Sequence, residues 1–122
     1  MRPPHVFWPL FCLVACSGPD APDVAVCRDV ITRLCQAATC PGVAGRLPAD
    51  EACEPALLER TGCGAEDFAF SEPSRQEVLE CREPLLSQST STAIPPRCED
   101  ARRLLTECPA VADFFFGGGG RQ

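Results

Sequence analysis

The sequence predicts an all-α fold, a small disulfide-stapled bundle of about four short helices. Apolar residues recur every three or four positions in four segments, which is the period of an amphipathic helix. No long run of β-branched residues alternates with polar ones, as a sheet would require. Ten cysteines occur in 122 residues, an excess typical of a chain held together by disulfides. A chain of this length has room for one small domain.

The first helix is predicted over residues 24–38, where Cys27, Val30 and Leu34 share one stripe. Either Asp20 or Asp23 is expected to cap its start, and the Cys-Pro-Gly at 40–42 to end it. Its opposite, polar side consists of Arg28, Asp29, Thr32, Arg33 and Gln36.

Three more helices are predicted over 50–61, 73–83 and 96–108. Gly62 and Gly64 supply the stop of the second, Ser74 and Glu77 form a capping box for the third, and Pro109 breaks the fourth. Residues 87–96, rich in Ser and Thr, are expected to form a mobile loop. Phe68 and Phe70 are expected to plug the core between the second and third helices, and one or two of Phe114–Phe116 to cover its end.

The N-terminus has the layout of a secretory signal peptide, with Arg2 followed by an apolar run from Val6 to Ala15. Ten residues rise about 15 Å as a helix, roughly half the hydrocarbon thickness of a bilayer. The residues Leu13-Val14-Ala15-Cys16 resemble the lipobox of bacterial lipoproteins. This resemblance implies cleavage before Cys16, lipidation of its thiol and attachment to a membrane. Ser17 at the next position, where Asp would imply inner-membrane retention, favours the outer membrane.

The sequence therefore divides into four parts. They are a signal peptide at 1–15, a lipidated cysteine and tether at 16–23, a disulfide-rich helical domain at 24–113 and a Phe/Gly-rich tail at 114–122.

Removal of Cys12 with the signal peptide and acylation of Cys16 leave an even number of cysteines, as a disulfide framework requires. Two segments, 53–63 and 98–108, share the pattern C-E-x-A-x4-T-x-C. Ten residues of helix span about 15 Å, too far for either pair of cysteines to close on itself. As a hypothesis, the matched helices pair Cys53 with Cys108 and Cys63 with Cys98. The eight predicted disulfide cysteines are Cys27, Cys35, Cys40, Cys53, Cys63, Cys81, Cys98 and Cys108.

Composition excludes several kinds of chemistry. The net charge of −6 argues against a nucleic-acid partner. All basic residues are arginine, and the single His is His5 in the signal peptide, so His-based catalysis and metal ligation are excluded from the mature chain. Acid–base work would fall to Glu66, Asp67, Glu99 or Asp100, which are expected on a solvated surface. We therefore expect no enzyme activity, no catalytic residues, no metal site and no cofactor.

The chain as a whole resembles short, Arg-rich, Cys-rich helical lipoproteins of myxobacteria, a group without a settled activity. This resemblance implies an envelope lipoprotein that acts as a non-catalytic interaction or structural module, held by the membrane and open to an unidentified protein partner. One alternative is a carrier of lipid or another small apolar ligand, as in the eight-cysteine plant lipid-transfer proteins, whose Cys-Cys and Cys-x-Cys pairs this chain lacks. Another alternative is an exported hydrolase inhibitor, which would need a rigid exposed loop, and residues 88–96 are the only candidate for it.

Overall fold

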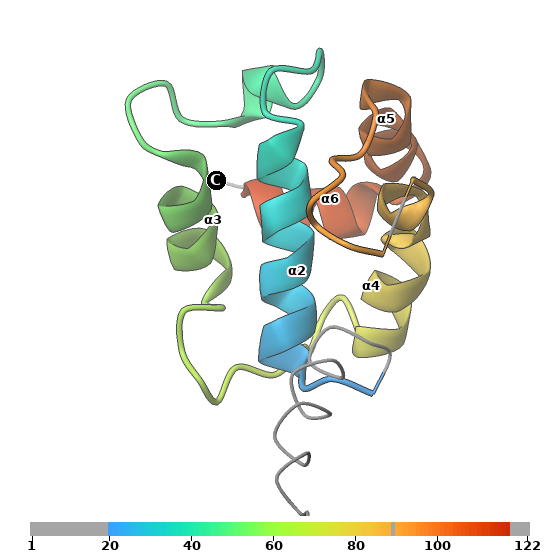
Figure 1. The fold of residues 1–122 in the computed structure, drawn as a ribbon. Helices are drawn as coiled ribbons and strands as arrows, with labels where there is room; N and C mark the ends of the chain where they lie inside the picture. The colour runs from blue at the N-terminus through green and yellow to red at the C-terminus, as the bar shows by residue number, and fades with distance from the viewer. Residues whose placement is uncertain (1–19, 89, 118–122) are drawn as a thin grey trace, which may run out of the picture.

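The computed structural model describes residues 20–88 and 90–117, and within them the regular structure is entirely helical (Figure 1). This confirms the predicted fold class. The α-helices are α2 (Asp23–Gln36), α3 (Cys53–Thr61), α4 (Arg75–Cys81), α5 (Cys98–Glu107) and α6 (Pro109–Phe116). Two short 3₁₀ helices, η3 (Ala44–Arg46) and η4 (Glu83–Leu86), lie between them.

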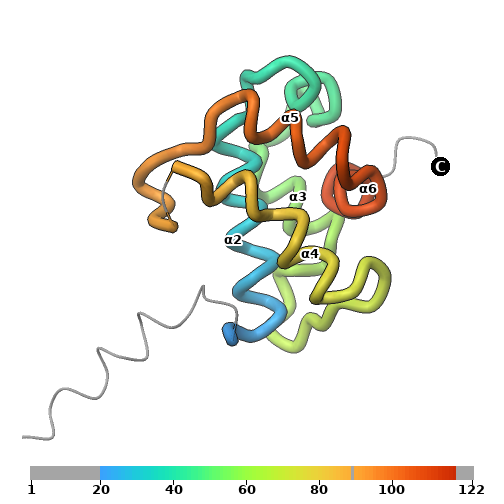
Figure 2. Tube along the Cα trace, turned by 90° about the vertical axis from the view of Figure 1, so that its right-hand side faces the viewer, coloured from blue at the N-terminus to red at the C-terminus, as the bar shows by residue number. Residues whose placement is uncertain are grey.

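Helix α2 runs through the middle of the bundle, with α3 on one side and α4 and α5 on the other (Figure 1). It packs against α3 and η4, while α6 packs against α3, α4 and α5. Figure 2 shows α5 and α6 following one another at an angle, so that α6 closes the side of the bundle opposite the connection that leads into α5. The core therefore surrounds α2.

Burial extends around most of α2, further than its apolar stripe predicted. Cys27, Val30 and Leu34 are fully buried, as expected for that stripe. Asp29 and Arg33, which were expected to face water, are buried as well. The expectation was wrong for these two residues because a central helix has neighbours on more than one side, so a polar face is covered too. Gln36 is exposed, as predicted.

The start of α2 differs from the prediction. The residue before the helix is Pro22, and no side chain caps the helix there. Asp23 is instead the first helical residue, where its negative charge suits the helix dipole. The predicted capping role of Asp20 or Asp23 is therefore wrong. Ala21 is buried, so the domain begins slightly before residue 24.

The structure shows the predicted end of α3 at Gly62 and a side-chain cap by Ser74 at the start of α4. Gly62 follows α3 in the left-handed region at φ +86°, which glycine adopts at little cost. Of the predicted capping box, the structure shows the Ser74 half, because the Ser74 side chain accepts a hydrogen bond from the Glu77 amide at the start of α4. Beyond α4, Pro84 lies in the first turn of η4 and diverts the chain into a tighter helix.

Helix α6 was not predicted. Pro109 ends α5 and also occupies the first position of α6, where its missing amide hydrogen costs nothing. The helix continues past residue 113, and Phe115 and Phe116 are buried in the core. The helical domain thus extends to the left-handed Gly117, and residues 118–122 of the expected tail lie outside the described residues.

Four disulfides cross-link the bundle, and each joins residues from different parts of the fold, with Cα atoms 5.4 to 6.2 Å apart. The hypothesis that Cys53 pairs with Cys108 and Cys63 with Cys98 is wrong. Helix α3 packs on α2, and α5 lies on the far side of α2 (Figure 1), so the two matched helices do not zip together. The pairs are Cys27–Cys63, Cys35–Cys53, Cys40–Cys98 and Cys81–Cys108.

Candidate functional site

The predicted membrane attachment lies outside the described residues. The signal peptide at 1–15, Cys16 and the tether up to residue 19 belong to that part. Among the helices of the described part, none combines the length and hydropathy needed to cross a bilayer.

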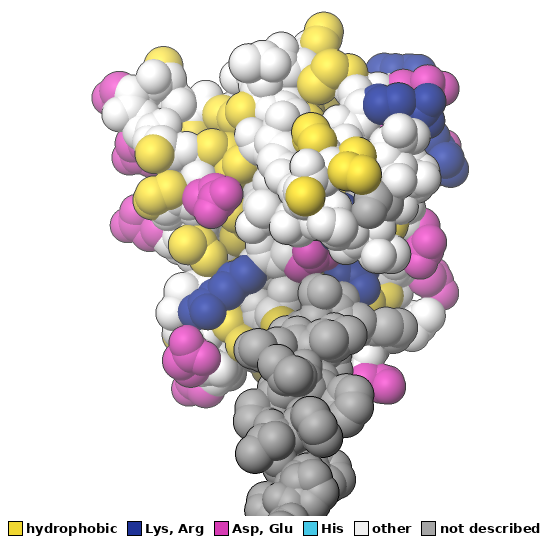
Figure 3. Space-filling view, in the orientation of Figure 1, with side chains coloured by type: hydrophobic (Ala, Val, Ile, Leu, Met, Phe, Trp, Pro, Cys, Tyr) yellow, Lys and Arg dark blue, Asp and Glu magenta, His cyan; other side chains and the backbone are white. Residues whose placement is uncertain are grey.

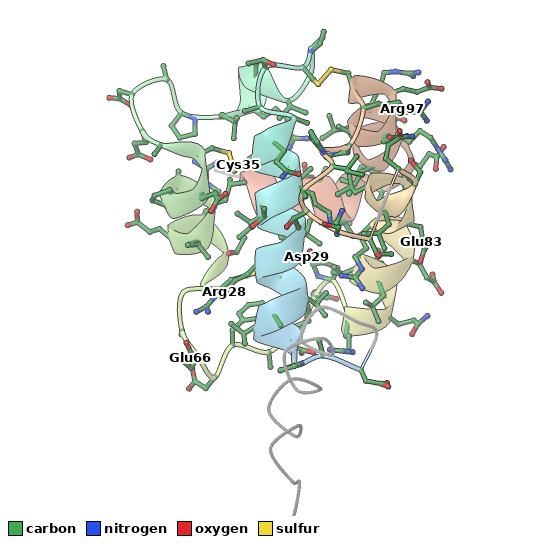
Figure 4. All side chains as sticks on the ribbon, in the orientation of Figure 1. Arg28, Asp29, Cys35, Glu66, Glu83 and Arg97 are labelled. Atoms are coloured by element: carbon green, nitrogen blue, oxygen red, sulfur yellow. A yellow bond between two sulfur atoms is a disulfide. The ribbon has the colours of Figure 1, made fainter. Side chains whose placement is uncertain are left out.

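The carboxylates considered for acid–base chemistry are not brought together. Glu66 and Asp67 are exposed in the connection after α3, and Glu99 is exposed at the start of α5. Figure 4 shows Glu66 and Arg97, which directly precedes α5, at opposite corners of the molecule. Glu66 lies 3.4 Å from the Arg28 guanidinium, an exposed ion pair. The surface placement expected for these three carboxylates is confirmed.

Asp100 differs, because only 2% of it is exposed. Its carboxylate accepts hydrogen bonds from the Arg97 backbone amide and guanidinium, which closes the first turn of α5. Burial by itself raises the pKa of Asp100, but the hydrogen bonds from Arg97 and Ser87 and the Arg97 charge outweigh it, so the pKa lies below its ordinary value. Asp100 is a buried capping residue, and its expected surface position is wrong.

A buried ionic cluster of Asp29, Arg33 and Arg82 lies between α2 and the end of α4 (Figure 4 labels Asp29 on α2). The Asp29 carboxylate is 3.1 Å from Arg33 Nε and 3.0 Å from Arg82 Nη1. Only 1% of Arg33 and 4% of Arg82 are exposed. One carboxylate therefore bridges two guanidinium groups inside the protein.

Arg33 extends the cluster to the connection that follows η4. Its guanidinium donates to the backbone carbonyl of Leu85 at 3.4 Å and to that of Thr90 at 2.6 Å. One turn further along α2, the Gln36 amide donates to the carbonyl of Thr92. Arg33 and Gln36 thus attach the 87–96 loop, which was expected to be mobile, to α2. The two points of attachment lie on either side of residue 91.

The part of this loop from Ser91 to Pro95 is an exposed turn, which we call the 91–95 turn. The Ala93 amide donates to Ser91 Oγ and the Ile94 amide to the Ser91 carbonyl. Ile94 is 49% exposed, the one large hydrophobic side chain in the described residues that is exposed to this degree. Figure 3 shows hydrophobic side chains over α2 and this connection, with acidic groups along the α3 side and arginines near α5.

The remaining aromatic residues form a cluster on the core. The Phe68 and Phe70 rings meet edge to face at 5.0 Å, and each lies about 6 Å from the ring of Phe114 on α6. All three side chains are partly buried against the core. Phe68 and Phe70 thus plug the core as predicted, but they do so against α6.

The described residues contain no group of three or more side chains of the kinds that bind metal ions. Their cysteines are all engaged in disulfides. The arrangement can therefore brace the fold and present the 91–95 turn.

Sequence reasoning missed the ionic cluster. Asp29 and Arg33 are four residues apart, a spacing that is typical of a solvated ion pair on a helix surface. A signal was present on the partner segment, because Arg82 falls in line with Val78, Cys81 and Leu85, all of which are buried. An arginine on an apolar stripe indicates a buried partner of opposite charge.

Comparison of the chain with protein-family models, with curated proteins and with solved structures finds no match in any of the three.

Proposed function

We propose that this chain is an exported lipoprotein, anchored in a bacterial membrane through Cys16, whose helical domain acts as a non-catalytic interaction or structural module of the cell envelope. The observation that carries the proposal is that the cysteines of this chain fall into two groups with different roles. One stands in a lipobox, Leu13-Val14-Ala15-Cys16, and every cysteine of the helical domain is in a disulfide.

The disulfides support export. Such bonds persist in oxidising compartments and are rare where cytosolic thiols keep cysteines reduced. Each disulfide adds about 2 to 4 kcal/mol of stability to a small domain. A domain braced at four places keeps its shape outside the cell, which suits a module that presents a surface.

The placement of the charged groups supports a non-catalytic role. The exposed carboxylates of the connection after α3 and of the start of α5 lie far apart (Figure 4). The buried carboxylates Asp29 and Asp100 are held by arginines and serve packing and capping. Neither arrangement pairs an acid with a base around a space for a substrate.

Attachment needs more than one acyl chain. A single chain of myristoyl length binds a bilayer with a constant of only about 10⁴ M⁻¹, whereas two or more hold firmly. The resemblance to lipoproteins implies lipidation of the Cys16 thiol and acylation of the new N-terminus, which together give more than one chain. The outer membrane is favoured because Ser17 follows the modified cysteine.

Intact-mass spectrometry of the chain, expressed from its own start codon in a Gram-negative host and extracted from membranes, tests the proposal. We expect a product that begins at Cys16, carries the acyl mass and has all cysteines of the helical domain oxidised. A product that retains Met1, or that begins at residue 16 without acyl mass, contradicts the anchor.

Two cysteine variants give a matched control. Cys16→Ser should abolish acylation and move the protein out of the membrane fraction. Cys12→Ser changes a residue that the cleavage removes, so the mature product should keep the wild-type mass and stay with the membranes. Membrane partition of Cys16→Ser at the wild-type level would contradict attachment through this residue.

An exported hydrolase inhibitor is a second candidate, because the 91–95 turn is exposed while its flanking carbonyls are held by Arg33 and Gln36. A pre-organised loop loses less entropy on binding than a flexible one. The test is inhibition of purified serine and cysteine peptidases by the wild type and by Ile94→Asp, with Gln76→Ala as a control on exposed α4. An inhibition that Ile94→Asp leaves unchanged counts against this use of the turn.

A further inference from the structure

The four disulfides differ in their access to solvent. Cys27 and Cys63 are both fully buried. Among the described cysteines only Cys98 is exposed to solvent, whereas its partner Cys40 is buried. Since a thiol must reach a sulfur atom to exchange with a disulfide, access ranks these bonds by reactivity. Of the four disulfides, Cys40–Cys98 is therefore the one that has an exposed residue at one end.

The other two disulfides are shielded to different degrees. Cys35 and Cys53 are each partly buried where α2 packs on α3, and Cys81 is 9% exposed beside a partly buried Cys108. In Figure 4 a sulfur–sulfur bond stands at the upper edge of the molecule, between the turn after α2 and the start of α5, above Arg97. This bond lies at the rim of the bundle.

The chain that follows Cys40 is exposed next to this bond. Pro41 and Gly42, which follow Cys40, are exposed. Gly42 has a φ of +89°, a conformation that favours glycine, so the chain turns there without a side chain. Cys98 is the first residue of α5 and has no preceding helical turn to cover it.

Opening this bond does not require the fold to open. The turn around Cys40 is held by hydrogen bonds from the Val43 and Ala44 amides to the Cys40 carbonyl. Helix α5 remains packed on α6 and η4 and linked near its end by the Cys81–Cys108 disulfide. Exchange at Cys98 is thus a local event, in contrast to exchange at Cys27–Cys63 in the core.

We propose that Cys98 Sγ is a thiol-exchange site, through which an external thiolate opens the Cys40–Cys98 disulfide while the other three stay closed. The incoming thiolate sulfur forms a bond to Cys98 Sγ, the Sγ–Sγ bond breaks, and its electron pair leaves on Cys40 Sγ, which takes a proton from water. A monothiol stops at the mixed disulfide on Cys98. A dithiol continues, because its second thiolate displaces Cys98 and leaves two protein thiols and an oxidised dithiol.

The site has a consequence for the 91–95 turn. The connection that carries Ile94 ends at Cys98, so this disulfide fixes one end of it to the turn after α2. Opening the bond removes the covalent link between that end and the turn after α2, while Arg33 and Gln36 continue to hold the carbonyls of Thr90 and Thr92. A thiol partner would thereby change the surface on which the turn lies.

The test exposes the folded, oxidised protein to three reagents in separate arms: reduced glutathione, dithiothreitol and a reduced thioredoxin-type dithiol protein. Free thiols are first blocked with light iodoacetamide, so that Cys12 or Cys16 does not contribute. Newly formed thiols are then labelled with heavy iodoacetamide and mapped by peptide mass spectrometry.

We expect Cys40 and Cys98 to be labelled first with dithiothreitol, at a rate at least about tenfold above that of the Cys27–Cys63 pair, which needs a larger opening. Glutathione should give an adduct on Cys98 and a free thiol on Cys40. If a folded partner also reaches Cys98, the thioredoxin-type protein should give the same labelling pattern as dithiothreitol. If only glutathione and dithiothreitol give labelling, the site accepts small thiols only.

A double variant, Cys40→Ser with Cys98→Ser, should lose the fast phase, and the matched double variant Cys35→Ser with Cys53→Ser should keep it. First labelling at Cys35–Cys53 or Cys81–Cys108, simultaneous opening of all four bonds, or a glutathione adduct on Cys40 would overturn the proposal. The order of labelling in the wild-type protein distinguishes these outcomes even if a variant fails to fold. Because the readout is confined to the helical domain, it is independent of acylation at Cys16.

Discussion

Replacement of Asp29 by Asn measures how much the buried ionic cluster depends on its one negative charge. The substitution keeps the size and shape of the side chain but removes the negative charge beside the buried Arg33 and Arg82 guanidinium groups. At an effective dielectric constant of 20, each charge pair at about 4 Å is worth about 4 kcal/mol. Repulsion between the two arginines and the cost of dehydrating all three groups offset part of that attraction.

Removal of one partner from a buried ion pair costs about 3 to 5 kcal/mol, because the remaining charge stays buried without compensation. We therefore expect Asp29→Asn to lower the free energy of unfolding by that amount. Whole domains are stable by about 5 to 15 kcal/mol, so the loss is a large fraction of the total.

Asp113→Asn is the matched control. Asp113 lies 2.7 Å from the Arg46 guanidinium, as close a pair as those of Asp29, but its side chain is 55% exposed. An exposed pair is worth at most about 1 kcal/mol. The assay is guanidinium chloride unfolding at pH 7 with disulfides intact, followed by far-UV circular dichroism. Equal losses for the two variants, or a loss below about 1 kcal/mol for Asp29→Asn, would refute the reasoning from burial.

Three further predictions concern acid, packing and capping. Burial raises the pKa of Asp23, but the hydrogen bonds from the Phe70 amide and from Arg75, together with the positive charge of Arg75, outweigh this effect. The pKa of Asp23 therefore lies below its ordinary value, and so does the pKa of Asp100. These carboxylates stabilise the fold above about pH 4, and denaturant titrations should show that contribution disappear as the pH falls from there through the lowered pKa values. Leu57→Ala should cost about 3 to 5 kcal/mol because the side chain is fully buried between α2 and α6, whereas Leu58→Ala at a partly buried position should cost clearly less in the same unfolding assay. Ser74→Ala should cost about 1 kcal/mol by removing the cap of α4, with Ser74→Asp restoring most of it.

Helix positions were largely readable from local signals. The stops at Gly62 and Pro109 and the cap at Ser74 act on the residues next to them, so their effect does not depend on the rest of the fold. The exception is α6, where Pro109 was taken only as a stop. The same residue begins a helix equally well, and the following Val111, Ala112 and Phe115 needed a core to pack against before that helix was evident.

The candidate site was less readable, because it depends on contacts between distant segments. Arg33 and Thr90 are 57 positions apart, and nothing near either of them indicates the other. The connection at 87–96 was recognised as a loop, but its exposed turn at 91–95 and its attachment to α2 were not.

By itself, the sequence determined that the domain is helical, that its cysteines are paired across elements, and that its chemistry must proceed without histidine or lysine. Periodicity and spacing suffice for these conclusions, since a helix of ten residues holds its terminal cysteines too far apart whatever surrounds it. Tertiary structure alone decided which cysteines meet, that Asp29 and Arg33 are buried, and that Cys98 is open to solvent. Periodicity describes each helix about its own axis, whereas burial and pairing depend on which helices become neighbours.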